Sequence, residues 1–190
     1  MYDELVNNIK RLLNNQEVAV IAISGHGGSG KTTLAKRLAE DFDIAAEQIV
    51  GLDNLHAKNY EDAKGLFELS DWAVIMELLK DIHTSGRLQY QTRDWKGVES
   101  RVDVAMPSLV IIEGVRLLRP EIKPYVDICV WIDCPLDVAS VRAKDRNRQQ
   151  GDTEEEIALW DTKWIPEAKK YVEKIHPEKI ADFIYTDQES

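Results

Sequence analysis

The chain has few cysteines, no long apolar run and no excess of positive charge. Its 190 residues include only 2 cysteines, Cys129 and Cys134, with no histidine or second cysteine pair beside them. This favours two reduced thiols over a disulfide or a zinc site. No stretch approaches the roughly 18 apolar residues of a membrane-spanning helix. Residues 1–15 lack the basic start and apolar run of a signal peptide. We expect a cytoplasmic protein without a membrane partner.

Acidic residues outnumber basic ones by 34 to 24, which gives a formal net charge of −10. This balance argues against a polymeric nucleic acid as partner, because binding to its backbone needs clustered positive surface. Apolar residues make up 44% of the chain, enough for a buried core. There is no repeat, low-complexity stretch or flexible linker. We therefore expect one domain over residues 1–190.

Short β-branched apolar runs alternate with stretches of helical periodicity. The runs expected to form strands are 18–24, 48–52, 109–112, 128–132 and 181–185. Helices are expected between them, with Ser70 as an N-cap, Pro135 as a first helical residue, a capping box at 153–156 and a kink at Pro166. This alternation predicts an α/β fold of three layers around a mostly parallel five-stranded sheet. Ligands of such sheets bind beyond the carboxyl ends of the strands.

A phosphate-binding loop follows the first expected strand. Residues 25–33 read G-H-G-G-S-G-K-T-T, which matches G-x-x-x-x-G-K-[ST] with a strand before it and a helix after it. Glycines allow the backbone to curl its N–H groups toward phosphate oxygens, and Lys31 adds a positive charge. His26 either contacts nucleotide or fills the loop tip. The candidate ATP-binding residues are Gly25, His26, Gly27, Gly28, Ser29, Gly30, Lys31, Thr32 and Thr33.

Two acidic residues follow two other expected strands. Asp53 comes after the second strand and Glu113 after the third, so both should reach the edge that carries the phosphate loop. A kinase needs a carboxylate that orients the attacking hydroxyl and one near Mg²⁺. The candidate magnesium ligands are Thr32, Asp53 and Glu113. The chain has no N-K-x-D motif for reading guanine, which disfavours a GTPase.

The order of these motifs resembles that of the uridine kinase/phosphoribulokinase family of P-loop kinases, especially its short bacterial members. The resemblance rests on the phosphate loop, on the strand ending at Asp53 and on I-I-E-G-V at 111–115, and it spans nearly the whole chain. It implies a P-loop NTPase fold with a helical lid. It also implies that Asp53 is the catalytic base and that Glu113 lies near the metal.

Residues 141–148 concentrate positive charge in this acidic chain. Arg142 and Arg146 are four residues apart and share one helical face. With Lys31 they are candidates for stabilising the transferring phosphoryl group, and Arg148 is a further candidate nucleotide contact. We expect a lid over approximately 142–156. The alternative is a solvated helix whose arginines pair with aspartates of the same helix.

The segment between the second and third strands, approximately 54–108, is expected to bind the acceptor. It resembles the sugar-reading segment of the family, but the histidine that normally follows there is missing. An aspartate could hold sugar hydroxyls and an aromatic ring could stack on a flat acceptor. The alternative is an ordinary hairpin with an aromatic residue packed on the core. The candidate acceptor-binding residues are Asp53, Tyr90, Arg93, Asp94 and Trp95.

The sequence thus predicts an ATP- and Mg²⁺-dependent kinase that phosphorylates a hydroxyl of a small molecule, with uridine or another nucleoside favoured. Two other classes remain: a P-loop ATPase, and a nucleotide-binding regulator without turnover. A kinase for a non-nucleoside acceptor, such as pantothenate or a sugar phosphate, also remains. The oligomeric state is not predicted.

Overall fold

The computed structural model describes residues 1–45, 48–57, 62–94 and 97–186. The helices are α1 (Tyr2–Leu13), α2 (Lys31–Asp41), α3 (Trp72–Asp81), α4 (Leu136–Gln150), α5 (Glu154–Leu159), α6 (Ile165–Ile175) and α7 (Pro177–Ile180). The strands are β1 (Ala19–Gly25), β2 (Val50–Gly51), β3 (Arg87–Arg93), β4 (Glu99–Ala105), β5 (Leu109–Gly114), β6 (Ile128–Ile132) and β7 (Phe183–Tyr185). Short 3₁₀ turns occur at η2 (Leu52–Asn54) and η3 (Lys123–Tyr125), and η4 (Trp160–Trp164) is a π-helix.

The central sheet has five strands in the order β2-β5-β1-β6-β7, and each neighbouring pair is parallel. This confirms the expected α/β architecture. The second strand is shorter than predicted, because the chain turns at η2 directly after β2. Asp53 therefore lies on a turn beyond the strand rather than at the strand end itself.

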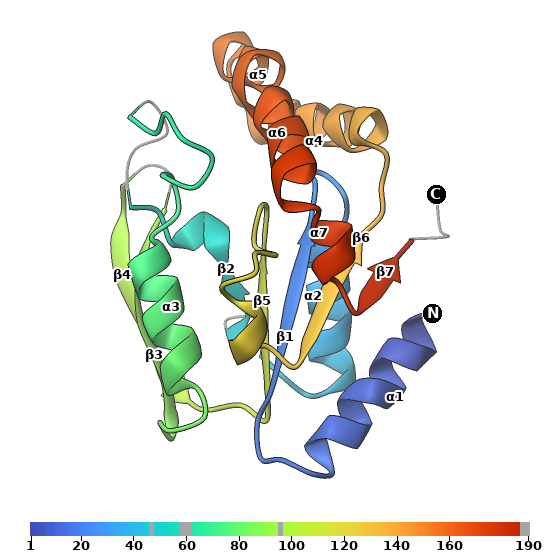
Figure 1. The fold of residues 1–190 in the computed structure, drawn as a ribbon. Coiled ribbons are helices and arrows are strands. Elements are labelled where there is room, and N and C mark those ends of the chain that lie inside the picture. Colours follow the sequence, from blue (N-terminus) through green and yellow to red (C-terminus); the bar gives the residue numbers. More distant parts are fainter. Residues whose placement is uncertain (46–47, 58–61, 95–96, 187–190) are drawn as a thin grey trace.

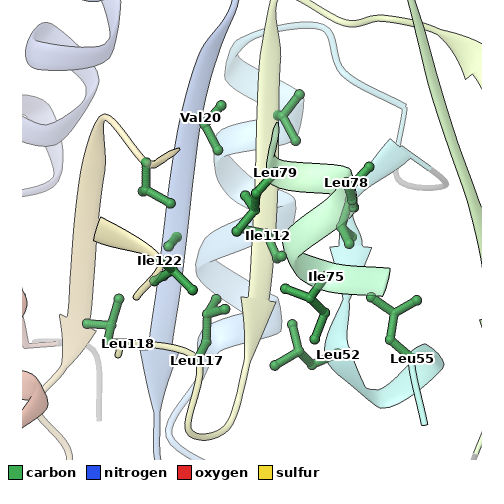
Figure 2. Packing of buried hydrophobic residues seen from close by; sticks show 14 of the residues in the cluster. Val20, Leu52, Leu55, Ile75, Leu78, Leu79, Ile112, Leu117, Leu118 and Ile122 are labelled. Atoms are coloured by element: carbon green, nitrogen blue, oxygen red, sulfur yellow. The ribbon is translucent and has the colours of Figure 1, made fainter. Parts of the chain in front are cut away.

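Both faces of the sheet are covered, which explains why β1 is buried throughout and largely apolar. Alternate residues of a strand point to opposite faces. Ala19, Ile21 and Ile23 belong to a core cluster with α1 and α2. Val20 and Ala22 belong to a second cluster with α3 and with residues after β5. Figure 2 shows this second cluster, in which leucines and isoleucines of α3 lie over β5. These two clusters and the sheet make the three expected layers.

The segment between β2 and β5 forms α3 and a separate antiparallel ribbon, β3–β4 (Figure 1). The predicted N-cap Ser70 is wrong by one residue. Asp71 caps α3, and its side chain accepts a hydrogen bond from the N–H of Val74 at 3.1 Å. A carboxylate is a good acceptor for the unpaired N–H groups of a first helical turn.

The C-terminal helices gather above the edge at which the parallel strands end (Figure 1). Gly151, with φ of 89°, ends α4, and Thr153 with Glu156 forms the predicted capping box of α5. The expected kink at Pro166 takes another form: α5 passes through the π-helix η4, and Pro166 lies in the first turn of α6. Pro135 is the N-cap of α4 rather than its first residue.

Both cysteines are thiols, Cys129 buried in β6 and Cys134 partly exposed after it. Within the described residues, no helix combines the length and apolar character required to cross a bilayer.

Candidate active site

The phosphate loop joins β1 to α2 and depends on glycine at two positions with left-handed backbone. Gly28 has φ of 84° and Gly30 has φ of 96°, values that other residues rarely adopt. Gly28 also packs on α4, since a β-carbon placed there would lie 2.1 Å from the Ala139 carbonyl oxygen. The loop is therefore wedged against the helix that carries the candidate lid arginines.

Lys31 is buried at the start of α2, and its Nζ donates a hydrogen bond to the His26 carbonyl at 2.8 Å. Burial lowers the pKa of this ammonium, whereas the carboxylates of Glu113 and Asp53 oppose that shift. Of the three predicted arginines, Arg146 lowers the pKa of Lys31 further. One lysine thus interacts with both predicted acids and with one predicted arginine.

Glu113 lies at the end of β5, in register with Gly51 of β2. Its Oε1 accepts a hydrogen bond from the Thr32 hydroxyl at 2.9 Å. Burial raises the pKa of Glu113, and the nearby Asp53 carboxylate adds to that rise. The neighbouring Thr33 is exposed.

These residues fit a bound phosphate and a magnesium ion. The Ser29 hydroxyl is buried in the loop without a hydrogen-bond partner among the described residues, so the loop retains an unused polar group. The part of the chain that the structure describes contains no group of three or more histidine, cysteine or acidic side chains that could hold a metal ion. Mg²⁺ bound with nucleotide usually takes one or two carboxylates and completes its shell with phosphates and water, and Thr32 with Glu113 offers oxygen ligands of this kind.

His26 packs its ring edge-on against Trp131 of β6, with centroids 5.4 Å apart. Burial lowers its pKa, and Lys31 lowers it further. The ring thus packs the loop tip against β6.

Asp53 is exposed on η2 and is the outermost member of the group. The negative charge of Asp53 raises the pKa values of Lys31, Glu113 and His56. A carboxylate in this position interacts electrostatically with Lys31 and Glu113 and is also accessible from solvent.

Sequence reasoning missed His56, which lies three residues after Asp53. Its side chain is 7% exposed, and its Nδ1 is buried without a hydrogen-bond partner in the described part of the chain. Burial lowers the pKa of His56; Asp53 and Asp94 raise it, whereas Arg93 and Arg116 lower it. The only sequence signal was the short spacing from Asp53, because the other neighbours come from distant segments.

The predicted acceptor residues are only partly brought together. Arg93 and Asp94 lie near His56: the His56 N–H donates to the Arg93 carbonyl at 3.0 Å, and Leu55 pairs with Arg93 as an isolated bridge. The Asp94 Oδ1 accepts from the Val98 N–H at 2.9 Å, so this carboxylate also holds the turn of the ribbon.

The prediction that Tyr90 lines the acceptor site is not supported, because its side chain belongs to the core cluster with α3. Alternation along β3 turns Leu88 and Tyr90 to the buried face. Burial raises the pKa of Tyr90 to about 12. The second predicted aromatic, Trp95, lies outside the described residues.

The three predicted arginines of α4 have different surroundings. The positive charge of Arg146 lowers the pKa values of both Lys31 and Glu113. Arg148 forms exposed ion pairs with Asp145 at 3.0 Å and Glu154 at 3.8 Å. Arg142 is exposed and has no ion pair within the described ranges. Only Arg146 is thus electrostatically linked to the phosphate loop.

The chain is similar in sequence to known proteins. The chain is 26% identical to the uridine kinases of Shewanella piezotolerans and Shewanella halifaxensis, over 92% of this chain and 94% of each relative. The family model of the NB-ARC domain matches residues 2–53, which include the phosphate loop.

Solved structures share the fold. A possible uridine kinase from Bacillus stearothermophilus superposes with a TM-score of 0.64 and 23% identity, covering 96% of this chain and 99% of that one. A candidate fructose transport system kinase from a Silicibacter species gives a TM-score of 0.73 and 21% identity, covering 95% and 98%. The predicted resemblance to uridine kinase-like P-loop kinases is confirmed, and the comparisons support a P-loop kinase.

Proposed function

We propose that this uridine kinase-like chain binds ATP with Mg²⁺ and transfers the γ-phosphoryl group to a hydroxyl of a nucleoside such as uridine. The observation that carries the proposal is the convergence of Lys31, Glu113 and Asp53 at one edge of the sheet, with the lysine buried, the glutamate partly buried and the aspartate exposed. A pure ATPase has no need of an exposed carboxylate on the side where an acceptor would enter.

Each residue has a role that follows from its environment. ATP supplies the phosphoryl group, and Mg²⁺ neutralises charge on its phosphates. Lys31 holds a fixed positive charge beside the loop, where burial strengthens its electrostatic effect. Thr32 and Glu113 would hold the metal, since their hydrogen bond already brings both oxygens together. Asp53 orients the acceptor hydroxyl and accepts its proton.

The acceptor is expected beside Asp53, where His56, Arg93 and Asp94 lie near one another. His56 and Arg93 line the same pocket, and Asp94 can accept from sugar hydroxyls. The insertion over approximately 54–108 would then form the acceptor wall. The segment of approximately 142–156 would form the lid, with Arg146 as its phosphate-facing charge.

The test is an acceptor-stimulated release of ADP, measured with uridine, cytidine, pantothenate and a panel of sugars and sugar phosphates. Transfer to a nucleoside should raise ADP release well above the rate without acceptor and should give a phosphorylated product. Asp81→Asn, which changes an exposed aspartate at the end of α3, is a matched control for Asp53→Asn. Equal ADP release with and without every acceptor would contradict the proposal and favour an ATPase.

A kinase for a non-nucleoside alcohol is the second candidate. It is favoured by the burial of Tyr90, which removes one of the two aromatic rings expected to stack on a base. In the same panel, phosphorylation of a sugar or pantothenate without phosphorylation of any nucleoside would select this candidate.

A further inference from the structure

Trp160 lies directly on the phosphate loop, although the two are far apart in sequence. A β-carbon placed on Gly27 would lie 2.5 Å from Cη2 and 2.9 Å from Cζ3 of the Trp160 ring. All three heavy atoms nearest to that position belong to this ring. The indole therefore lies so close to the α-carbon of Gly27 that a β-carbon on this residue would clash with it.

The backbone of Gly27 does not explain why glycine stands there. Among the glycines of the described residues, positive φ occurs at Gly28, Gly30, Gly97 and Gly151 and not at Gly27. An alanine could adopt this backbone. The obstacle to alanine is Trp160, so the glycine and the indole form one packing unit.

The local fold holds the ring in this position. Trp160 opens the π-helix η4, and such wide turns are frequent at functional sites because they redirect side chains. The next residue, Asp161, is bound by Lys144 of α4 at 2.7 and 2.8 Å. Lys163 donates to the Ala63 carbonyl at 3.0 Å, which ties η4 to the insertion between β2 and β5.

The loop is consequently held from two sides, by α4 at Gly28 and by the Trp160 ring at Gly27. We propose that Trp160 is a positioning residue that fixes the phosphate loop and excludes water from it, so that the phosphoryl group passes to the acceptor and not to water. This inference rests on the proposed function for its chemistry, but the packing unit itself does not.

The two competing reactions differ only in the nucleophile. In transfer, the acceptor oxygen forms a bond to the γ-phosphorus, the bond from that phosphorus to the β,γ-bridging oxygen breaks, and the hydroxyl proton goes to Asp53. In hydrolysis, a water oxygen forms the same bond and inorganic phosphate is released with ADP. A ring that keeps water out slows the second reaction more than the first.

The first experiment needs no substrate and measures thermal unfolding of four proteins: the parent, Gly27→Ala, Trp160→Ala and the double variant. Gly27→Ala should lower the midpoint in the parent by about 2–10 °C, because the added methyl overpacks against the ring. In the Trp160→Ala background, the same methyl should lower the midpoint of thermal unfolding by at most about half as much. Such non-additivity is the signature of two residues in contact.

Trp164→Ala is the matched control, since Trp164 belongs to the same π-helix but packs with Arg116 and Lys163. It should not relieve the effect of Gly27→Ala. An equal cost of Gly27→Ala in the parent and Trp160→Ala backgrounds would overturn the packing unit.

The second experiment measures inorganic phosphate and phosphorylated uridine in parallel, with ATP as donor. Trp160→Ala should raise the ratio of hydrolysis to transfer by about 5-fold or more, and Trp160→Phe, which keeps a ring, should restore most of the parent ratio. A ratio unchanged by Trp160→Ala would overturn the role in excluding water. Absence of transfer by the parent to every acceptor would contradict the proposed function instead, and the unfolding experiment would still decide whether the ring fixes the loop.

Discussion

The phosphate side and the acceptor side of the candidate site are built in different ways. The phosphate side comes from one continuous segment, residues 25–33, with Glu113 added by a neighbouring strand. The acceptor side is assembled from η2, the end of β3 and Arg116, which an isolated bridge, a backbone hydrogen bond and side chains bring together. A contiguous motif fixes its own geometry, whereas an assembled wall depends on contacts between distant segments.

The two sides also differ in how tightly their charges are buried. Lys31 is buried and Glu113 is partly buried, so the interaction between their charges is stronger than at the open surface. Asp53 is exposed at the junction between the sides. Substitutions on the phosphate side should therefore affect turnover most, and those on the acceptor side should affect acceptor affinity.

Asp53→Asn should have the largest effect, because the residue acts where the two sides meet. The amide keeps the size of the side chain but cannot accept the proton, so the transfer rate should fall by about 10²–10⁴-fold. Binding of an ATP analogue, measured by calorimetry, should change little. A variant that phosphorylates its acceptor as fast as the parent would place the base elsewhere.

Lys31→Ala should reduce turnover by about 10²–10³-fold, since a preorganised buried charge stabilises the transition state more than the ground state. Far-ultraviolet circular dichroism should show an unchanged fold. Lys36→Ala, which removes an exposed lysine of the same helix, is the matched control and should retain the parent rate. Near-normal turnover of Lys31→Ala would contradict the assignment of the phosphate site.

The contrast between the two sides also explains which parts of the fold and of the candidate site could be predicted from the sequence. The sheet, the phosphate loop and the positions of Glu113 and Asp53 followed from apolar runs and a local motif, which short-range physics determines. The sequence left two places open for Tyr90, the acceptor site and the core, because its packing against α3 is a long-range property. His56 was missed because its partners Asp94 and Arg116 are remote in sequence. The π-helix and its contact with Gly27 have no signature in a single sequence.

Arg146 and Arg142 provide a paired test within one helix. Arg146→Ala should lower turnover by about 10-fold, less than the lysine variant, because an exposed guanidinium is partly screened by solvent and salt. Arg142→Ala should change turnover by less than about 2-fold, since Arg146 and not Arg142 is among the charges that shift the pKa values of Lys31 and Glu113. Steady-state rates at low and high salt would check both values, and equal losses would contradict the assignment of Arg146 alone to the phosphates.

His56 and Tyr90 test the acceptor side. His56→Ala should raise KM for the acceptor by about 3–10-fold through loss of a side chain that lines the acceptor pocket, with a smaller change in kcat. Tyr90→Phe should leave KM within about 2-fold, because its ring is in the core and only the hydroxyl is removed. Initial rates over a range of uridine concentrations would measure both. A larger rise in KM for Tyr90→Phe than for His56→Ala would place Tyr90 in the acceptor site and His56 outside it.

The smallest expected effect is a gain in stability when Glu113 becomes Gln. Burial raises the pKa of Glu113 above its ordinary value of 4.5, despite the attraction of Lys31. The folded protein therefore holds a proton more readily than the unfolded chain, and the ionised carboxylate at pH 7 lowers the free energy of unfolding. Glu113→Gln removes that cost and can still accept the Thr32 hydroxyl, so the midpoint of thermal unfolding at pH 7 should rise by a few degrees. As the pH falls through the raised pKa toward 4.5, the parent becomes protonated as well and the difference should disappear. Glu17→Gln, at an exposed position, is the matched control and should give no such pH-dependent gain. A loss of stability at pH 7 would mean that pairing with Lys31 outweighs burial, and that the phosphate side is stabilised by its charges rather than strained by them.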